Sequence, residues 1–142
     1  TLSIGSLNLG LRDYVLTRTA DGYSLYKWAN KMIKDERAVI SVHRAIVFGK
    51  NKTISTDYVN FINQNLDARK LYINQISKYK PKYLVTWGRE NNLLIFENCI
   101  SKLIHTEKNV GYHGTRNPFN RGSLYDGFIY EIKDMNLNKC IN

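Results

Sequence analysis

The chain has 142 residues and a formal net charge of +9, from 21 lysines and arginines against 12 aspartates and glutamates. This length fits one domain, and a hydrophobic content of 43% with 2 prolines excludes an intrinsically disordered protein. The sequence has no run of about 18 apolar residues, and its first residues lack the pattern of a secretory signal. We therefore expect one compact domain over residues 1–142, and we interpret the start at Thr1 as that of a mature chain or an excised domain.

The excess of positive charge favours anionic partners, namely nucleic acid, phospholipid head groups or phosphorylated glycans. It fits a lysine-rich soluble surface equally well. The two cysteines, Cys99 and Cys140, lack the CxxC or histidine spacing that is typical of a metal site. We favour two free thiols over a disulfide, because Cys99 lies in an apolar pattern and Cys140 lies in the C-terminal tail.

The first part of the sequence predicts an arm, a helix and a strand. Residues 1–20 show little pattern and predict an irregular N-terminal arm. Asp21 is a candidate N-cap for a helix over residues 22–34, in which apolar residues recur at helical spacing. After a charged turn at residues 34–37, the segment AVISVHRAIVF (38–48) is rich in β-branched residues, which predicts a central strand covered on both faces.

The following residues continue the alternation of helices and strands. Thr56 is a candidate cap for one long helix or two collinear helices over residues 57–79, divided near residues 65–67. Pro81 ends this helical pattern, and the segment KYLVTW (82–87) predicts a second strand.

Gly88 permits a turn into a third helix, predicted over residues 91–104. Short strands are predicted at residues 108–112 and 127–133. Because parallel strands need a helical crossover, this order predicts an α/β fold: a three-layer sandwich with a mainly parallel, Rossmann-like small sheet. The sequence leaves open whether the last strand runs antiparallel at an edge of this sheet.

In open α/β sheets, ligands bind beyond the carboxyl ends of the strands. We therefore take residues that follow predicted strands as the best candidates for a binding site. Side chains able to bind a ligand follow each of three predicted strands, and we expect them to converge. These candidates are His43 and Arg44, then Arg89 beside Trp87, then His113, Arg116, Asn117 and Arg121.

The candidate cluster is cationic and suits phosphate or carboxylate, since arginine binds those groups with two parallel hydrogen bonds. Other interpretations stay open. His43 also fits a neutral core histidine, Arg116 and Arg121 also fit a solvated loop, and Asn117 before proline is typical of a turn.

Several common classes of active site have no local motif in this sequence. The histidines at 43, 105 and 113 lack metal-ligand spacing, and phosphate loops of the GxGxxG or GxxxxGK type and serine elbows of the GxSxG type are absent. Glu90 is the one acid in the candidate groups, which disfavours a paired-carboxylate glycosidase. We expect neither a metal nor a cofactor, and the sequence leaves open whether the chain is an enzyme.

The segment YKWANKMIKDERAVISVHRAIVF (26–48) resembles the soluble tail domains of membrane-embedded glycosyltransferases that use lipid-linked sugars, with Trp28, Asn30 and Asp35 at the matching places. The later segment KPKYLVTWG (80–88) resembles the second strand of those domains. This resemblance implies a non-catalytic, extracytoplasmic accessory domain of a membrane protein. Its partner would be an anionic phosphorylated glycan or lipid head group, and no catalytic residue is carried over.

The same KPKYLVTWG segment also resembles a strand of the uracil-DNA glycosylase superfamily, in which a later histidine- and proline-containing loop meets DNA. The segment YHGTRNPFNRG (112–122) departs from that loop, because His113 and Pro118 are separated. This second resemblance implies a cytoplasmic, DNA-binding enzyme with nucleic acid as its partner, and Trp87 would be the candidate for stacking on a flipped base.

Overall fold

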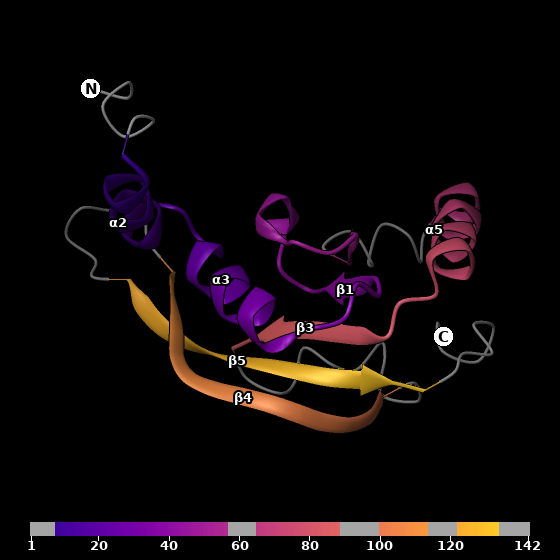
Figure 1. The fold of residues 1–142 in the computed structure, drawn as a ribbon. Helices are drawn as coiled ribbons and strands as arrows, with labels where there is room; N and C mark the ends of the chain where they lie inside the picture. Colours follow the sequence, from indigo (N-terminus) through magenta and orange to yellow (C-terminus); the bar gives the residue numbers. More distant parts are fainter. Residues whose placement is uncertain (1–7, 57–64, 89–99, 114–121, 134–142) are drawn as a thin grey trace.

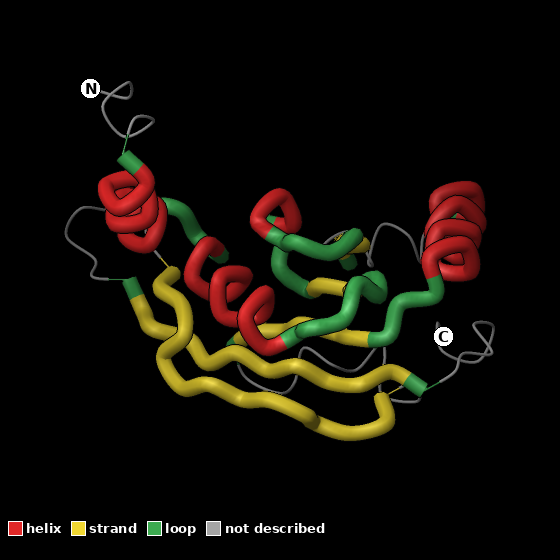
Figure 2. The backbone as a smooth tube through the Cα atoms, in the orientation of Figure 1, coloured by secondary structure: helices red, strands yellow, loops and turns green. Residues whose placement is uncertain are grey.

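The computed structural model describes residues 8–56, 65–88, 100–113 and 122–133. These residues form three α-helices, one short 3-10 helix and five strands (Figure 1 and Figure 2). In chain order the elements are α2 Leu9–Thr19, α3 Tyr23–Met32, β1 Val39–Ser41, the 3-10 helix η1 Ile46–Phe48, β2 Thr53–Ser55, α5 Leu66–Tyr79, β3 Tyr83–Trp87, β4 Ile100–His113 and β5 Ser123–Ile132. Among the described residues, no helix has the length and apolar character needed to span a membrane.

The five strands form one mixed sheet in the order β2-β1-β3-β5-β4. β1 is parallel to β2 and β3, whereas β5 is antiparallel to both β3 and β4 and forms the longest ladders. The prediction of a three-layer sandwich with a mainly parallel, Rossmann-like sheet is therefore wrong in its sheet, whose longest ladders are antiparallel, although helices do lie against both faces. The last strand, β5, is antiparallel to its neighbours but does not lie at an edge, because it pairs with β3 as well as with β4.

The helix predicted over residues 91–104 is wrong from residue 100 onward, because residues 100–113 form strand β4; residues 91–99 lie outside the described part of the chain. The register of β4 against β5 shifts at three places along the strand. Each shift inserts extra residues and breaks the alternation of a regular strand, so the apolar side chains fall at spacings that mimic a helix. The strand predicted at residues 108–112 lies within β4.

The strand predicted over residues 38–48 forms only at Val39–Ser41, and β3 rather than β1 is the middle strand of the sheet. Local side-chain contacts explain the early end of β1. The His43 amide donates to Ser41 Oγ at 3.1 Å, and the Ala45 amide donates to His43 Nδ1 at 3.1 Å. Such bonds offer the backbone an alternative to the strand ladder, and the chain turns into η1.

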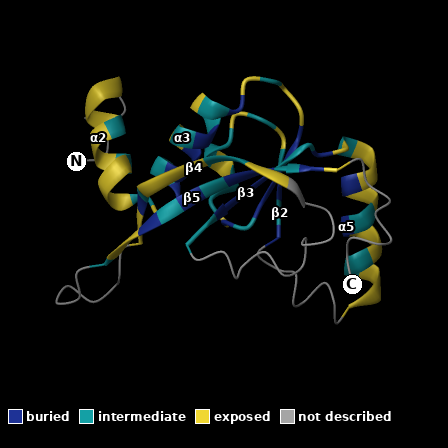
Figure 3. Ribbon diagram, turned by 90° about the horizontal axis from the view of Figure 1, so that it is seen from below, coloured by how far each residue is buried: buried dark blue, intermediate teal, exposed yellow. Residues whose placement is uncertain are grey.

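The predicted strands at residues 82–87 and 127–133 are confirmed as β3 and as part of β5. The prediction of an irregular arm over residues 1–20 is wrong for Leu9–Thr19, which form α2. This helix buries none of its residues, so its sequence shows no apolar stripe (Figure 3).

The helix predicted over residues 22–34 is confirmed as α3, although its N-cap residue is Gly22 and not Asp21. α5 begins at Leu66, where the Asn65 side chain accepts hydrogen bonds from the next amides. The predicted division near residues 65–67 is thus the start of a helix, and residues 57–64 lie outside the described part.

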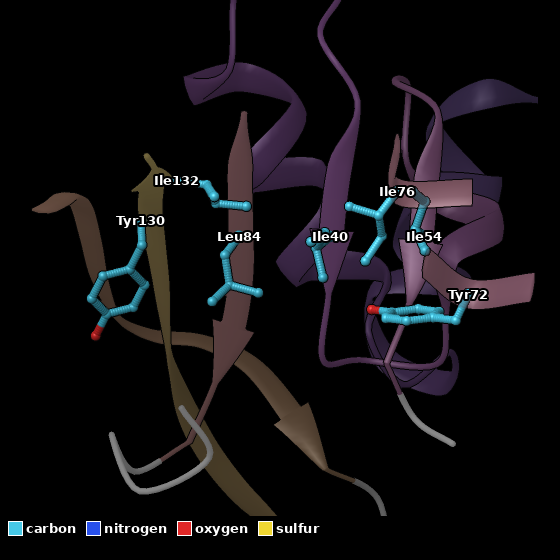
Figure 4. Close-up of a cluster of buried hydrophobic side chains, with 7 residues drawn as sticks. All are labelled: Ile40, Ile54, Tyr72, Ile76, Leu84, Tyr130 and Ile132. Carbon is cyan, nitrogen blue, oxygen red and sulfur yellow. The ribbon is translucent and has the colours of Figure 1, made fainter. Parts of the chain in front are cut away.

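Each face of the sheet carries a hydrophobic core formed with a different helix. Neighbouring strand residues point to opposite faces, so Val85 packs with α3 whereas Leu84 packs with α5. The cluster on the α3 side contains Leu25, Ala29, Ile33, Val39, Val85, Tyr125 and Ile129. The cluster on the α5 side contains Ile40, Ile54, Tyr72, Ile76, Leu84, Tyr130 and Ile132 (Figure 4).

Two aliphatic side chains on α5 provide a test of this packing. Ile76 is fully buried, whereas Leu71 on the same helix is 66% exposed. Replacing Ile76 with alanine is expected to lower the free energy of unfolding by about 2–5 kcal/mol, because a cavity forms under the helix. The matched variant Leu71→Ala is expected to change it by less than about 0.5 kcal/mol. Urea unfolding measures both values, and equal losses would contradict the packing of α5.

Candidate functional site

Two histidines that are far apart in the sequence meet at one carboxylate. His43 Nε2 lies 3.3 Å from Asp21 Oδ1, and His113 Nδ1 lies 2.9 Å from Asp21 Oδ2. His43 follows the end of β1, and His113 is the last residue of β4. The two strands run in the same direction, because β5 lies between β3 and β4 and is antiparallel to both. Their carboxyl ends therefore lie at the same edge of the sheet.

The hydrogen bonds assign the protons on both rings. The Ala45 amide donates to Nδ1 of His43, so the proton of the neutral His43 ring lies on Nε2 and points at Asp21. The Asp21 carboxylate accepts only, so Nδ1 of His113 also carries a proton. Nε2 of His113 then points away from the carboxylate, on a side chain that is 50% exposed.

Gly22 explains why the Asp21 carboxylate can reach both rings. Its backbone is left-handed, with φ at 83°, and a Cβ atom there would collide with the His43 ring and lie 2.6 Å from Cβ of Ala45. Glycine adopts this conformation without steric cost. The sharp turn leaves the carboxylate of Asp21 outside the α3 cap, where it contacts the histidines instead of helix amides.

Aromatic rings enclose the carboxylate and the histidines. The Trp87 ring stacks on His113 with centroids 5.8 Å apart and an interplanar angle of 24°, and it meets His43 edge-on at 5.4 Å. Tyr125 lies 4.9 Å from the Trp87 ring. These contacts fix the plane of the His113 ring, so its free nitrogen has a defined direction.

A second, buried network holds the backbone of His43. Tyr26 Oη donates to Ser41 Oγ at 2.6 Å, and Ser41 Oγ donates to the His43 carbonyl at 3.2 Å. Burial raises the pKa of Tyr26 to about 12, against the weaker lowering effect of the Ser41 hydrogen bond. Burial, followed by the Asp21 carboxylate, raises the pKa of Tyr125 to about 12. The hydroxyl of Tyr125 is buried beside the Asp21 carboxylate and the Gly22 backbone.

The structure brings together two of the residues predicted from the sequence, His43 and His113. Arg44 is exposed in the turn after β1. The remaining predicted residues, Arg89, Arg116, Asn117 and Arg121, lie outside the described part of the chain, as do Cys99 and Cys140.

Sequence reasoning missed the role of Asp21, which it treated as a helix cap, and missed Tyr125. The Asp21-Gly22 pair is the sequence feature that could have indicated this role, since glycine after aspartate is typical of a left-handed turn. Tyr125 alternates with Gly127 and Ile129 on the face of β5 that packs against α3, and strand alternation alone points to that face.

The arrangement permits two kinds of chemistry at Nε2 of His113. In the neutral ring this nitrogen accepts a proton, as a general base does, and in the protonated ring it donates a hydrogen bond to an anion. Within the described residues, no group of three histidine, cysteine or acidic side chains is placed to hold a metal ion.

A family model described as "DUF1420 C-terminal domain" matches residues 17–142, which include Asp21, both site histidines and every described strand. No curated protein and no solved structure matches the chain significantly.

Removing the Asp21 carboxylate should weaken the connection between the turn before α3 and the ends of β1 and β4. Asp21→Ala is expected to lower the free energy of unfolding by about 1–2 kcal/mol, because two hydrogen bonds to a partly exposed charged group are lost. Hydrogen exchange of the Ala45 amide should accelerate, since His43 loses its orienting partner. The matched control is Glu36→Ala, which removes an exposed carboxylate elsewhere. Equal stability and exchange in both variants would contradict the bridge.

The buried tyrosines predict a loss of stability at high pH. The pKa values of Tyr26 and Tyr125 are about 12 in the folded chain and near the ordinary tyrosine value of 10.0 when the chain is unfolded. Their contribution is thus complete below pH 10 and is lost as the pH rises toward 12.

Urea unfolding across this range should show a smaller decline for Tyr26→Phe than for the wild type, by roughly 2 kcal/mol at its upper end. Tyr14→Phe, at a side chain that is 53% exposed, is the control. Identical declines in the wild type and Tyr26→Phe would show that Tyr26 does not titrate in this way.

Proposed function

We propose that this chain, which belongs to the DUF1420 C-terminal domain family, is a non-catalytic accessory domain of a membrane glycosyltransferase that binds an anionic, phosphate-bearing ligand at the carboxyl ends of its strands. The ligand is the phosphate of a glycan or of a lipid head group. The observation that carries this proposal is the orientation of His113 by Asp21, which engages Nδ1 and leaves Nε2 on a half-exposed side chain.

The sequence that follows His113 is rich in positive charge. His113 and Ser123 are partners in the β4–β5 ladder, so the segment between them starts and ends at the edge of the sheet where the histidines meet. That segment carries Arg116 and Arg121, whose contacts with the ligand remain predictions, as does the role of Asn117. Imidazolium and guanidinium groups together suit a phosphate, because both donate charge-assisted hydrogen bonds.

The contacts of the residues that carry the glycosyltransferase resemblance favour a supporting role. Asn30 Nδ2 donates to the Phe48 carbonyl at 2.9 Å, and Asn30 Oδ1 accepts from the Lys50 amide at 2.8 Å. Tyr83 Oη donates to Asp35 Oδ2 at 2.7 Å. These polar groups join α3 to η1 and the turn after α3 to β3, and such contacts organise a fold rather than perform chemistry.

The description of the family as a C-terminal domain agrees with a tail that follows other parts of a longer protein. In this proposal those other parts supply the membrane attachment and the catalytic acids, and the present domain lies outside the cytoplasm. The alternative, a DNA-binding enzyme resembling uracil-DNA glycosylases, makes a different prediction: DNA binding that weakens steeply with salt.

The proposal is tested by titrating the isotope-labelled chain with inorganic phosphate, and separately with phosphatidylglycerol and phosphatidylcholine vesicles. Phosphate should shift the ring resonances of His113, and His113→Ala should weaken phosphate binding about threefold to tenfold, because one charge-assisted hydrogen bond is lost. The matched control is His105→Ala, which removes another histidine of β4.

The titrations with vesicles show whether the phosphate belongs to a lipid head group or to a soluble or glycan-linked group. Selective binding to phosphatidylglycerol assigns the site to lipid head groups, whereas binding of free phosphate alone assigns it to a soluble or glycan-linked group. Equal phosphate binding by the wild type and His113→Ala would overturn the proposal. Salt-sensitive binding to duplex DNA in place of phosphate binding would favour the enzyme alternative.

A further inference from the structure

An open groove of about 520 Å³ lies between α3 and the bulged part of β4, with one wall from α2. None of the residues that line it belongs to the Asp21 site. Its floor includes apolar atoms of Trp28, Met32 and Val110, and its rim carries charged and neutral polar side chains. A groove with an apolar floor and a polar rim has the general composition of a small-molecule site.

The charged side chains on the rim of the groove carry a net positive charge. Lys27 already pairs with Asp13, with 2.7 Å between Nζ and Oδ2. Lys31 and Lys108 form no ion pair with any described residue, and both are exposed. Glu107 is the acidic residue that lines the groove, and its negative charge repels an anion there. Two uncompensated lysines against one glutamate favour a ligand with negative charge.

The β4 wall of the groove is held in an unusual backbone conformation. The register of β4 against β5 shifts between Glu107 and Gly111, so the intervening residues form a bulge. Asn109 within it is left-handed, with φ at 54°, and its amide donates to Asp126 Oδ1 at 2.8 Å. Bulges often direct side chains at binding sites. Here the bulge places Lys108 and the Asn109 side chain along the groove.

The floor of the groove is rigid, because α3 lies close against β5 at this point. A Cβ atom at Gly127 would lie 2.8 Å from the Trp28 ring and 2.7 Å from Val110, so only glycine allows this approach. The Trp28 indole N–H is buried and has no hydrogen-bond partner among the described residues. An unpaired donor of this kind is uncommon in a folded interior.

We propose that this groove binds a sugar that carries a phosphate or a carboxylate. Lys31 and Lys108 bind the anionic group, Asn109 and Ser24 hydrogen-bond the hydroxyls, and the Trp28 floor takes the apolar face of the ring. This inference is independent of the phosphate site at His113, because the two sets of residues are separate.

The test uses the two tryptophan indole N–H resonances of the ¹⁵N-labelled chain, assigned with a Trp87→Phe variant. Glucose 1-phosphate and glucuronate should each shift the Trp28 resonance, whereas glucose and inorganic phosphate should shift it much less at equal concentration. The double variant Lys31→Ala/Lys108→Ala should weaken binding of glucose 1-phosphate about tenfold, since two charge-assisted contacts are lost.

Two further variants separate this site from loss of folding and from the His113 site. Glu107→Gln should tighten binding about twofold to threefold, because it removes the opposing charge. Lys102→Ala, an exposed lysine on the same strand, and His113→Ala should leave the Trp28 titration unchanged. The proposal is overturned if neither sugar acid shifts Trp28, if the double lysine variant binds as tightly as the wild type, or if glucose or inorganic phosphate binds equally well.

Discussion

The position of β5 between β3 and β4 is the constraint on which the rest of the structure depends. Ile129 of β5 belongs to the hydrophobic cluster with α3, and the next residue, Tyr130, belongs to the cluster with α5. Both cores therefore include this one strand, since neighbouring strand residues face opposite sides of the sheet. Because β5 is antiparallel to both neighbours, it also makes β4 run in the same direction as β3.

That shared direction explains how distant residues form one site. β1, β3 and β4 end at the same edge of the sheet, so His43, Trp87 and His113 come together although 70 residues separate the two histidines. Asp21 then joins the turn before α3 to both strand ends. The carboxylate positions His113 through a hydrogen bond, and the buried His43 positions the carboxylate.

The sequence predicts those elements whose apolar pattern has a regular period. α3 and β3 fall in this class. The expectation that side chains after strand ends converge is met by His43 and His113, which both contact Asp21, whereas their binding of a ligand stays a prediction. The pattern fails for β4, whose bulges disturb the alternation, and for α2, which buries no side chain and so shows no stripe. The pattern predicts β5 as a strand but not its place between β3 and β4, because the neighbours of a strand depend on tertiary pairing that no local period encodes.

The role of Asp21 depends on a single backbone angle. An aspartate before a helix is usually an N-cap, and the residues that follow Asp21 support that interpretation. The left-handed Gly22 moves the carboxylate away from the helix amides and toward the histidines. Glycine permits both conformations, so the sequence alone does not choose between a cap and a site residue.

The two proposed sites lie against the same face of β5. Tyr125 contacts Trp87 at the histidine site, and Gly127 underlies Trp28 in the groove. In the β4–β5 ladder, Glu107 of the groove pairs with Gly127, and His113 pairs with Ser123. The two sites are thus four residues apart along β5, or roughly 13 Å at the rise of a strand. One strand therefore supports both sites, and the position of β5 in the sheet determines the geometry of each.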